Sequence, residues 1–139
     1  MGLTDVNFVA VVVAAIANYV LGMFWYSPAL FGKKWPQWAG LTHEKMAEMK
    51  KKGMTMGYVG AYVGSFVVAW AIAYLVGRMG IQSTASAIKL GVFLAIGFSA
   101  TLRLGSVLWE GKPKQLWMMN VAYDLVGFSI MAVITALWK

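Results

Sequence analysis

Four long apolar stretches constrain the fold of this chain more than any other feature. A helix needs about 20 consecutive apolar residues to cross a bilayer, and only 12% of the 139 residues are charged. Soluble domains have about a quarter charged residues. The sequence therefore predicts an all-α integral membrane protein with four transmembrane helices, spanning approximately residues 6–26, 54–77, 86–109 and 116–138.

The connections between these stretches predict a single four-helix transmembrane domain over residues 1–139. Loops 78–85 and 110–115 are short, and short connections make neighbouring helices antiparallel, so an up-down bundle is expected. Loop 27–53 is long and is expected to lie at the membrane interface. It contains LTHEKMAEMKKKG, residues 41–53, where Thr42 can cap an amphipathic loop helix and Gly53 can end it.

Basic residues gather on one side of the predicted bundle. Cytoplasmic loops carry an excess of Lys and Arg. We therefore expect a protein of the cell (inner) membrane in which loops 27–53 and 110–115 lie on the cytoplasmic side and both termini on the outer side. The net charge of +7 then reflects topology and contact with the bilayer, and no nucleic-acid-binding motif accompanies it. Eight lysines lie in these loops, Lys33, Lys34, Lys45, Lys50, Lys51, Lys52, Lys112 and Lys114, against Arg78, Lys89 and Lys139 on the other side.

Small residues recur every fourth position in three of the spans. In lipid, helices associate by close backbone approach, which small residues permit. We expect these stripes to pack the bundle, and one of them to remain for a homo-oligomer contact. The stripes are Ala10, Ala14, Asn18 and Gly22; Gly57, Ala61, Ser65, Ala69, Ala73 and Gly77; and Ala87, Gly91, Ala95 and Ser99.

Arg103 lies inside an apolar run, where its guanidinium cannot lose its proton. Residues four apart share a helix face, so Ser99 and Arg103 lie on one side of the third span, and Asn120 and Asp124 on one side of the fourth. Counting from the turn near Lys112 places Arg103 and Asp124 at the same depth, about 9–12 Å inside the membrane edge. The sequence therefore predicts an ion pair between adjacent helices.

Two interpretations of this pair remain open. It can be a structural pair that fixes the register of the hairpin, or part of a site that binds or conducts a small polar or charged solute, since intramembrane charges usually mark function. An alternative function is that of an accessory or scaffold subunit, which binds a partner membrane protein through loop 27–53 and the small-residue faces. The candidate ligand-binding residues are Arg103, Asp124, Asn120, Asn18, Tyr62 and Ser99.

The sequence favours no catalytic chemistry. His43 is the only histidine and the chain has no cysteine, so neither a nucleophile–base arrangement nor a zinc site can be assembled. We expect no catalytic residue, no metal site and no cofactor. A lipid-modifying membrane enzyme is the remaining enzymatic alternative.

Two blocks of sequence resemble a family of small bacterial membrane proteins, the domain of unknown function numbered seventeen sixty-one. They are GMFWYSPALFGKKWPQWAGLT, residues 22–42, and LWEGKPKQLWMMNVAYDLVGF, residues 108–128. The resemblance implies four spans and no assigned activity, and Asp124 lies outside the motif. The matching positions are an interface motif, Trp25, Tyr26, Ser27, Pro28, Phe31, Gly32 and Lys33, and a second group, Glu110, Lys112, Asn120 and Tyr123.

The lysine distribution predicts the result of reporter fusions. An alkaline phosphatase joined to the C-terminus should be active, because that enzyme folds only outside the cytoplasm, and a fluorescent protein that folds only in the cytoplasm should be dark there. The same reporters inserted after Gly53 should give the reverse pattern. Fluorescence at the C-terminus would overturn the orientation.

Overall fold

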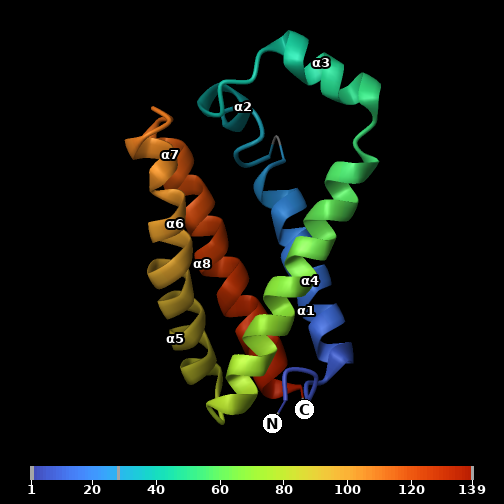
Figure 1. Ribbon diagram of the computed structural model, residues 1–139, viewed down its shortest axis with the longest axis vertical. Helices are drawn as coiled ribbons and strands as arrows, with labels where there is room; N and C mark the ends of the chain where they lie inside the picture. The colour runs from blue at the N-terminus through green and yellow to red at the C-terminus, as the bar shows by residue number, and fades with distance from the viewer. Residues whose placement is uncertain (1, 28, 139) are drawn as a thin grey trace.

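The computed structural model describes residues 2–27 and 29–138, and every regular element in these residues is a helix (Figure 1). Four helices are long and apolar enough to cross a membrane, which confirms the predicted all-α membrane class. The third of them, residues 84–108, is divided into four short elements. The helices are α1 (Phe8–Trp25), α2 (Trp35–Trp38), α3 (His43–Lys52), α4 (Thr55–Arg78), α5 (Thr84–Leu94), η1 (Ala95–Ala100), α6 (Thr101–Arg103), α7 (Gly105–Leu108) and α8 (Lys114–Leu137).

The observed spans begin and end within two residues of the predicted bounds. The predicted loop helix is α3, and its ends are formed as expected. Thr42 Oγ1 accepts a hydrogen bond from the amide of Lys45 at 3.2 Å. Gly53 ends the helix with a φ of 84°, a left-handed conformation that glycine adopts without steric cost.

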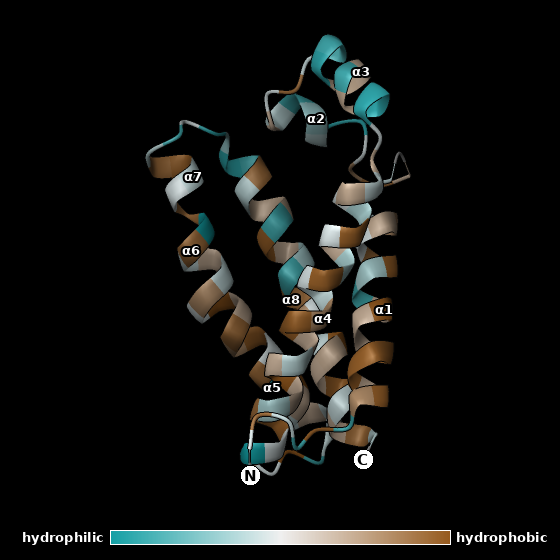
Figure 2. Ribbon diagram, turned by 45° about the vertical axis from the view of Figure 1, so that its right-hand side comes forward, coloured by the Kyte–Doolittle hydropathy of each residue, from teal (hydrophilic) through white to brown (hydrophobic). Residues whose placement is uncertain are grey.

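The two ends of the bundle differ (Figures 1 and 2). At the terminal end, which holds residues 2–7 and the connection 79–83, α1, α4, α5 and α8 converge on a core of apolar side chains, including Val11, Ile72 and Met131. At the loop end, which holds residues 26–54 and 109–113, the α5–α7 arm and α8 diverge from α1 and α4 (Figure 1). Helix α8 is central, because it packs on α5, α1 and α4.

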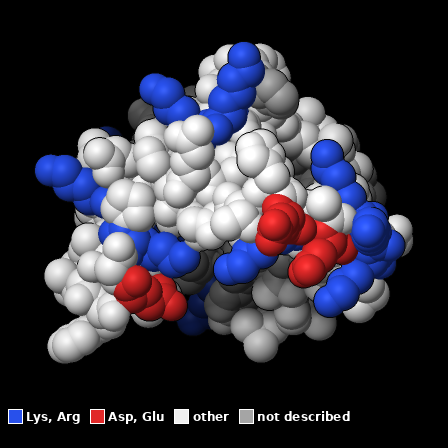
Figure 3. Space-filling model, turned by 90° about the horizontal axis from the view of Figure 1, so that it is seen from above, with Lys and Arg blue, Asp and Glu red and all other residues white. Residues whose placement is uncertain are grey.

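Charged side chains mark the loop end. Figure 3 looks onto it and shows lysine and arginine side chains spread around the rim, with acidic side chains in patches among them. Helix α3 stands above the bundle, is hydrophilic along its length (Figure 2), and has no buried residue. The loop end therefore has the composition of a polar surface and the terminal end that of an apolar core.

The small-residue stripe of the third span lies entirely against the bundle, because Ala87, Gly91, Ala95 and Ser99 are all buried. Gly91 sets the closest approach. A Cβ at this position would lie 2.6 Å from both the backbone nitrogen and the Cα of Ser129 on α8. The prediction that small residues pack the bundle is confirmed for this span.

The small-residue stripe of α4 is buried only in the half of the helix that is nearer the terminal end. Ser65, Ala69 and Ala73 are buried, whereas Gly57 and Ala61 are exposed. An α-helix turns 100° per residue, so a strict four-residue repeat drifts by about 40° at each step. This drift, together with the divergence of the helices at the loop end, leaves the part of the stripe near the loop end without a packing partner.

The third span keeps its stripe on one face because it contains a π-helical segment, η1. A π turn holds more residues than an α turn, which reduces the drift of the four-residue repeat. Side chains and a neighbouring helix bind the backbone around it: Thr101 Oγ1 donates to the carbonyl of Gly97 at 2.8 Å, and Trp117 Nε1 donates to the carbonyl of Ala100 at 2.9 Å. The segment thus brings Ser99 and Arg103 toward α8.

Substitution of Gly91 should separate α5 from α8. We expect Gly91→Ala to lower the free energy of unfolding by about 1–3 kcal/mol, the usual cost of overpacking, measured by unfolding in mixed micelles. Gly97→Ala is the matched control in the same span, because a Cβ at Gly97 meets no atom within 4 Å. Equal stability of the two variants would contradict the close approach.

Candidate functional site

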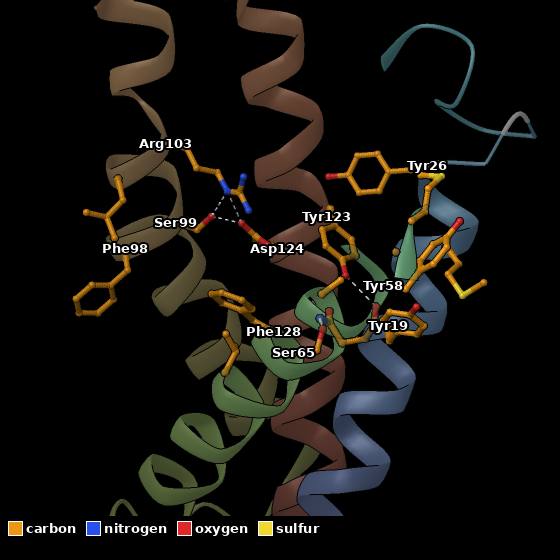
Figure 4. Close-up of a pocket in the computed structure, with 18 residues that line it drawn as sticks. Tyr19, Tyr26, Tyr58, Ser65, Phe98, Ser99, Arg103, Tyr123, Asp124 and Phe128 are labelled. Atoms are coloured by element: carbon orange, nitrogen blue, oxygen red, sulfur yellow. Dashed lines mark hydrogen bonds and ion pairs between the residues drawn. The ribbon is translucent and has the colours of Figure 1, made fainter. Parts of the chain in front are cut away.

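The predicted ion pair is present. Arg103, at the end of α6, donates from Nε to Asp124 Oδ2 of α8 at 2.8 Å (Figure 4), the usual length of a charge-assisted hydrogen bond. Ser99 Oγ also donates to Asp124 Oδ2, and Arg103 Nε lies 3.3 Å from Ser99 Oγ. One carboxylate oxygen therefore holds both side chains that η1 and α6 present to α8.

The two charges are unequally buried. The Asp124 side chain is 9% exposed and the Arg103 side chain 44% exposed. Among the described residues, only Nε of the guanidinium has a protein partner, so Nη1 and Nη2 keep their donors free. The carboxylate is used by the protein, whereas most of the guanidinium is available to something else.

The pair borders a cavity of about 780 Å³ that all four spans line. Arg103 and Asp124 are the only charged residues of its lining, and the rest is aromatic, apolar, small or neutral polar. Helix α4 forms one wall, η1 and α6 the opposite wall, and α1 and α8 the back. The lining residues are Asn18, Tyr19, Gly22, Met23, Tyr26, Met54, Tyr58, Ala61, Gly64, Ser65, Val68, Phe98, Ser99, Leu102, Arg103, Tyr123, Asp124 and Phe128.

Neutral polar groups close the back of this cavity. Asn18 on α1 donates to Ser65 Oγ on α4 at 2.9 Å, and its side chain fits against α8 only because residue 127 is glycine. Tyr123 donates to the carbonyl of Asn18 at 2.9 Å. Its ring passes Gly22, where a Cβ would lie 2.8 Å from the hydroxyl.

Four of the six predicted ligand-binding residues line the cavity, namely Asn18, Ser99, Arg103 and Asp124. Tyr62 is not in its lining. Its ring packs edge-on against Tyr19, with the centroids 5.9 Å apart, so it fills the seam between α1 and α4. The expectation that Tyr62 joins the cluster was wrong because depth along a helix does not fix the side on which a residue lies.

Asn120 also lies outside this cavity. Its side-chain oxygen accepts a hydrogen bond from the Tyr26 hydroxyl at 2.6 Å. It lines a second, smaller cavity of about 220 Å³ on the other side of Arg103, together with Glu110 and Lys112. Arg103 lines both cavities and therefore lies between the large apolar space and a smaller polar one.

The interface motif forms an aromatic cluster on α8. Trp25 packs against Phe31 and Tyr123, with centroids 5.5 and 6.2 Å apart, and Tyr26 packs against Trp35 and Tyr123 at 5.9 and 5.5 Å. The motif thus fixes the start of loop 27–53 to the fourth span.

The remaining motif residues shape the turn that follows α1. Ser27 donates from Oγ to the carbonyl of Phe24 at 2.6 Å, and its own carbonyl accepts from the amide of Gly32 at 2.8 Å. Lys33 is exposed at the loop end. Pro28 lies outside the described residues.

Several cavity residues were missed by sequence reasoning. Tyr19, Tyr58 and Ser65 line the cavity, but the two tyrosines have no distinctive spacing, and the stripe that contains Ser65 indicates packing and not a binding site. Tyr26 and Tyr123 could have been found, because both belong to the two blocks that resemble a family. Among the described residues, no group of three His, Cys, Asp or Glu could hold a metal ion.

These features define a class: a multi-pass helical membrane protein with an ion pair at the edge of an intramembrane cavity. The chain belongs to the DUF1761 family, described as protein of unknown function, whose model matches residues 9–136. The predicted family membership is therefore confirmed, and both resembling blocks lie in the matched range. No curated protein and no solved structure matches the chain.

The ion pair predicts the outcome of removing one partner. Asp124→Asn should lower the free energy of unfolding by about 1–3 kcal/mol, the cost of leaving a polar partner unsatisfied, because the guanidinium and Ser99 both depend on Oδ2. Ser99→Ala should cost less, since the salt bridge survives. Unfolding in mixed micelles measures both, and an Arg103→Gln, Asp124→Asn double variant should recover part of the loss. An Asp124→Asn variant as stable as the wild type would contradict the assignment.

Proposed function

We propose that this chain is a non-enzymatic membrane protein that binds or conducts a small polar or charged solute in the large cavity. The observation that supports this is the half-exposed guanidinium at its edge. Arg103 is held by Nε to a buried carboxylate, and its other nitrogens have no partner among the described residues. A purely structural pair would use the guanidinium more fully, since arginine can bind a carboxylate through two parallel hydrogen bonds.

The cavity also has the size and composition of a binding site. Its volume of about 780 Å³ lies within the range of about 300–1,000 Å³ that is typical of ligand pockets. Such pockets are mostly apolar and contain a few polar groups that fix orientation. Here those groups come from all four spans, through Asn18, Ser65, Ser99, Arg103 and Asp124.

The surroundings of the site are part of the proposal. We place the loop end on the cytoplasmic side of the inner membrane, because eight lysines lie there. The polar cavity with Lys112 then opens toward the cytoplasm. A homo-oligomer would use the upper face of α4, where a Cβ at Gly57 or Gly60 meets no atom within 4 Å.

A second candidate function, that of an accessory subunit, is favoured by α3. This helix has no buried residue and stands clear of the spans (Figure 1), as a helix that meets a partner protein would. In that case the large cavity has no solute to admit. The two candidates therefore differ in whether water-soluble reagents reach the cavity.

Because the chain has no cysteine, single cysteines can report this access. Gly64 lines the cavity, and a side chain there meets no atom within 4 Å. We expect Gly64→Cys to react with a water-soluble sulfonate thiol reagent. It should react faster than with a cationic reagent, because Arg103 attracts the anion, and Arg103→Gln should remove that preference. Mass spectrometry of protein in nanodiscs measures both rates.

Gly60→Cys is the matched control. It lies one turn nearer the loop end on the same helix, has equally open space, and does not line the cavity. If only the distance from the aqueous loop end mattered, Gly60→Cys would react faster than Gly64→Cys. Equal or lower reactivity at Gly64 than at Gly60 would overturn the proposed function and leave the accessory role.

A further inference from the structure

We propose that the ligand of the large cavity is an anionic amphiphile: a molecule with one acidic head, carboxylate or phosphate, and a single apolar chain. This inference rests on the proposed function, because it names the class of solute for the same site. It follows from three features of the cavity, which are the free part of the guanidinium, the apolar walls and the side on which it opens.

The head is assigned to Arg103. Its Nη1 and Nη2 donors are unpaired among the described residues, and a planar guanidinium presents two parallel donors that match carboxylate or phosphate oxygens. A cationic head is disfavoured, because Asp124 is 7% exposed and its Oδ2 already accepts from Arg103 and Ser99. A ligand can therefore contact the positive charge of Arg103, whereas the negative charge of Asp124 is buried and already paired within the protein.

The apolar chain of the ligand is assigned to the apolar walls of the cavity. Phe98 and Leu102 on the η1–α6 side line the cavity together with Val68 on α4 and Phe128 on α8. Phe98 and Leu102 are 58% and 78% exposed, so a ligand would cover apolar surface that the protein leaves uncovered.

The cavity is open between α4 and the third span, because its lining residues Tyr58, Phe98 and Leu102, which lie on these two helices, are 51%, 58% and 78% exposed. Helix α4 packs on α1 and α8, and the two walls of the cavity stand apart in the close-up, with Phe98 and Arg103 on one side and Ser65 and Tyr58 on the other (Figure 4). In a bilayer this side faces acyl chains. A ligand whose chain is already in the membrane can thus reach Arg103 without losing its apolar surroundings.

The test is photolabelling of the full chain in phosphatidylcholine nanodiscs. The probe is dodecanoate with a diazirine near the end of its chain, and mass spectrometry locates the labelled residues. We expect labels on η1, α6 or α8 residues that line the cavity. Excess dodecyl phosphate should compete for them, whereas dodecyltrimethylammonium, acetate and inorganic phosphate should not.

Variants assign the label to the guanidinium. Arg103→Gln should reduce cavity labelling about tenfold or more, as expected for loss of a charge-assisted hydrogen bond. The Arg103→Gln, Asp124→Asn double variant should do the same without leaving an unpaired carboxylate. Arg78→Gln is the matched control, because Arg78 is exposed at the terminal end of α4, and its labelling should equal that of the wild type.

The outcomes separate this inference from the function on which it rests. Labelling outside the cavity, or equal competition by dodecyltrimethylammonium, would overturn the anionic amphiphile. Equal competition by inorganic phosphate would show that the head alone binds, and would overturn the assignment of the chain. No specific label, with Gly64→Cys still reactive toward the sulfonate reagent, would overturn this inference alone. Loss of that reactivity as well would overturn the proposed function.

Discussion

A permanent charge inside an apolar helix is the constraint on which the rest of this structure depends. Arg103 can lie there because its Nε forms a salt bridge with Asp124 Oδ2 on the neighbouring span at 2.8 Å. Insertion of an unpaired charge into the membrane would cost at least about 2.5–3.5 kcal/mol of free energy. The pair fixes α8 in register against η1 and α6. The helices around it remain far enough apart to leave a cavity, and the contact through Nε leaves Nη1 and Nη2 without a partner among the described residues at the edge of that cavity.

Much of the fold could be predicted because its determinants are local. The four spans follow from hydropathy, and the ends of α3 follow from Thr42 and Gly53. The pairing of Arg103 with Asp124 follows from a tight turn and a constant rise per residue. The exclusion of Tyr62 and Asn120 could not be predicted in this way, since each depends on one particular partner, the ring of Tyr19 and the hydroxyl of Tyr26. Counting residues along a helix gives the depth of a residue in the membrane. The direction in which its side chain points depends on the side chains around it.

The sequence contains a pattern that is typical of a widened helical turn, and this pattern coincides with the π-helical segment η1. The third span repeats small residues every fourth position, as α4 does, yet only the third span keeps the whole stripe buried. A strict four-residue repeat does not match the 3.6 residues of an α turn, and a wider turn reduces the drift of such a stripe around the helix. Thr101 and Ser106 supply side-chain hydrogen bonds to the carbonyls of Gly97 and Arg103, in and just after this segment. The divergence of the helices at the loop end, in contrast, depends on contacts between distant segments.

The contact between Gly22 and Tyr123 has a structural consequence. The tyrosine hydroxyl reaches the backbone of α1 at Asn18, its ring leans on Trp25 and Tyr26, and the next residue along α8 is Asp124. Tyr123 therefore connects α1 to the turn of α8 that holds Asp124. Because Trp25 and Tyr26 stand where α1 passes into the long loop, a single tyrosine connects the start of that loop to the residue next to the buried carboxylate.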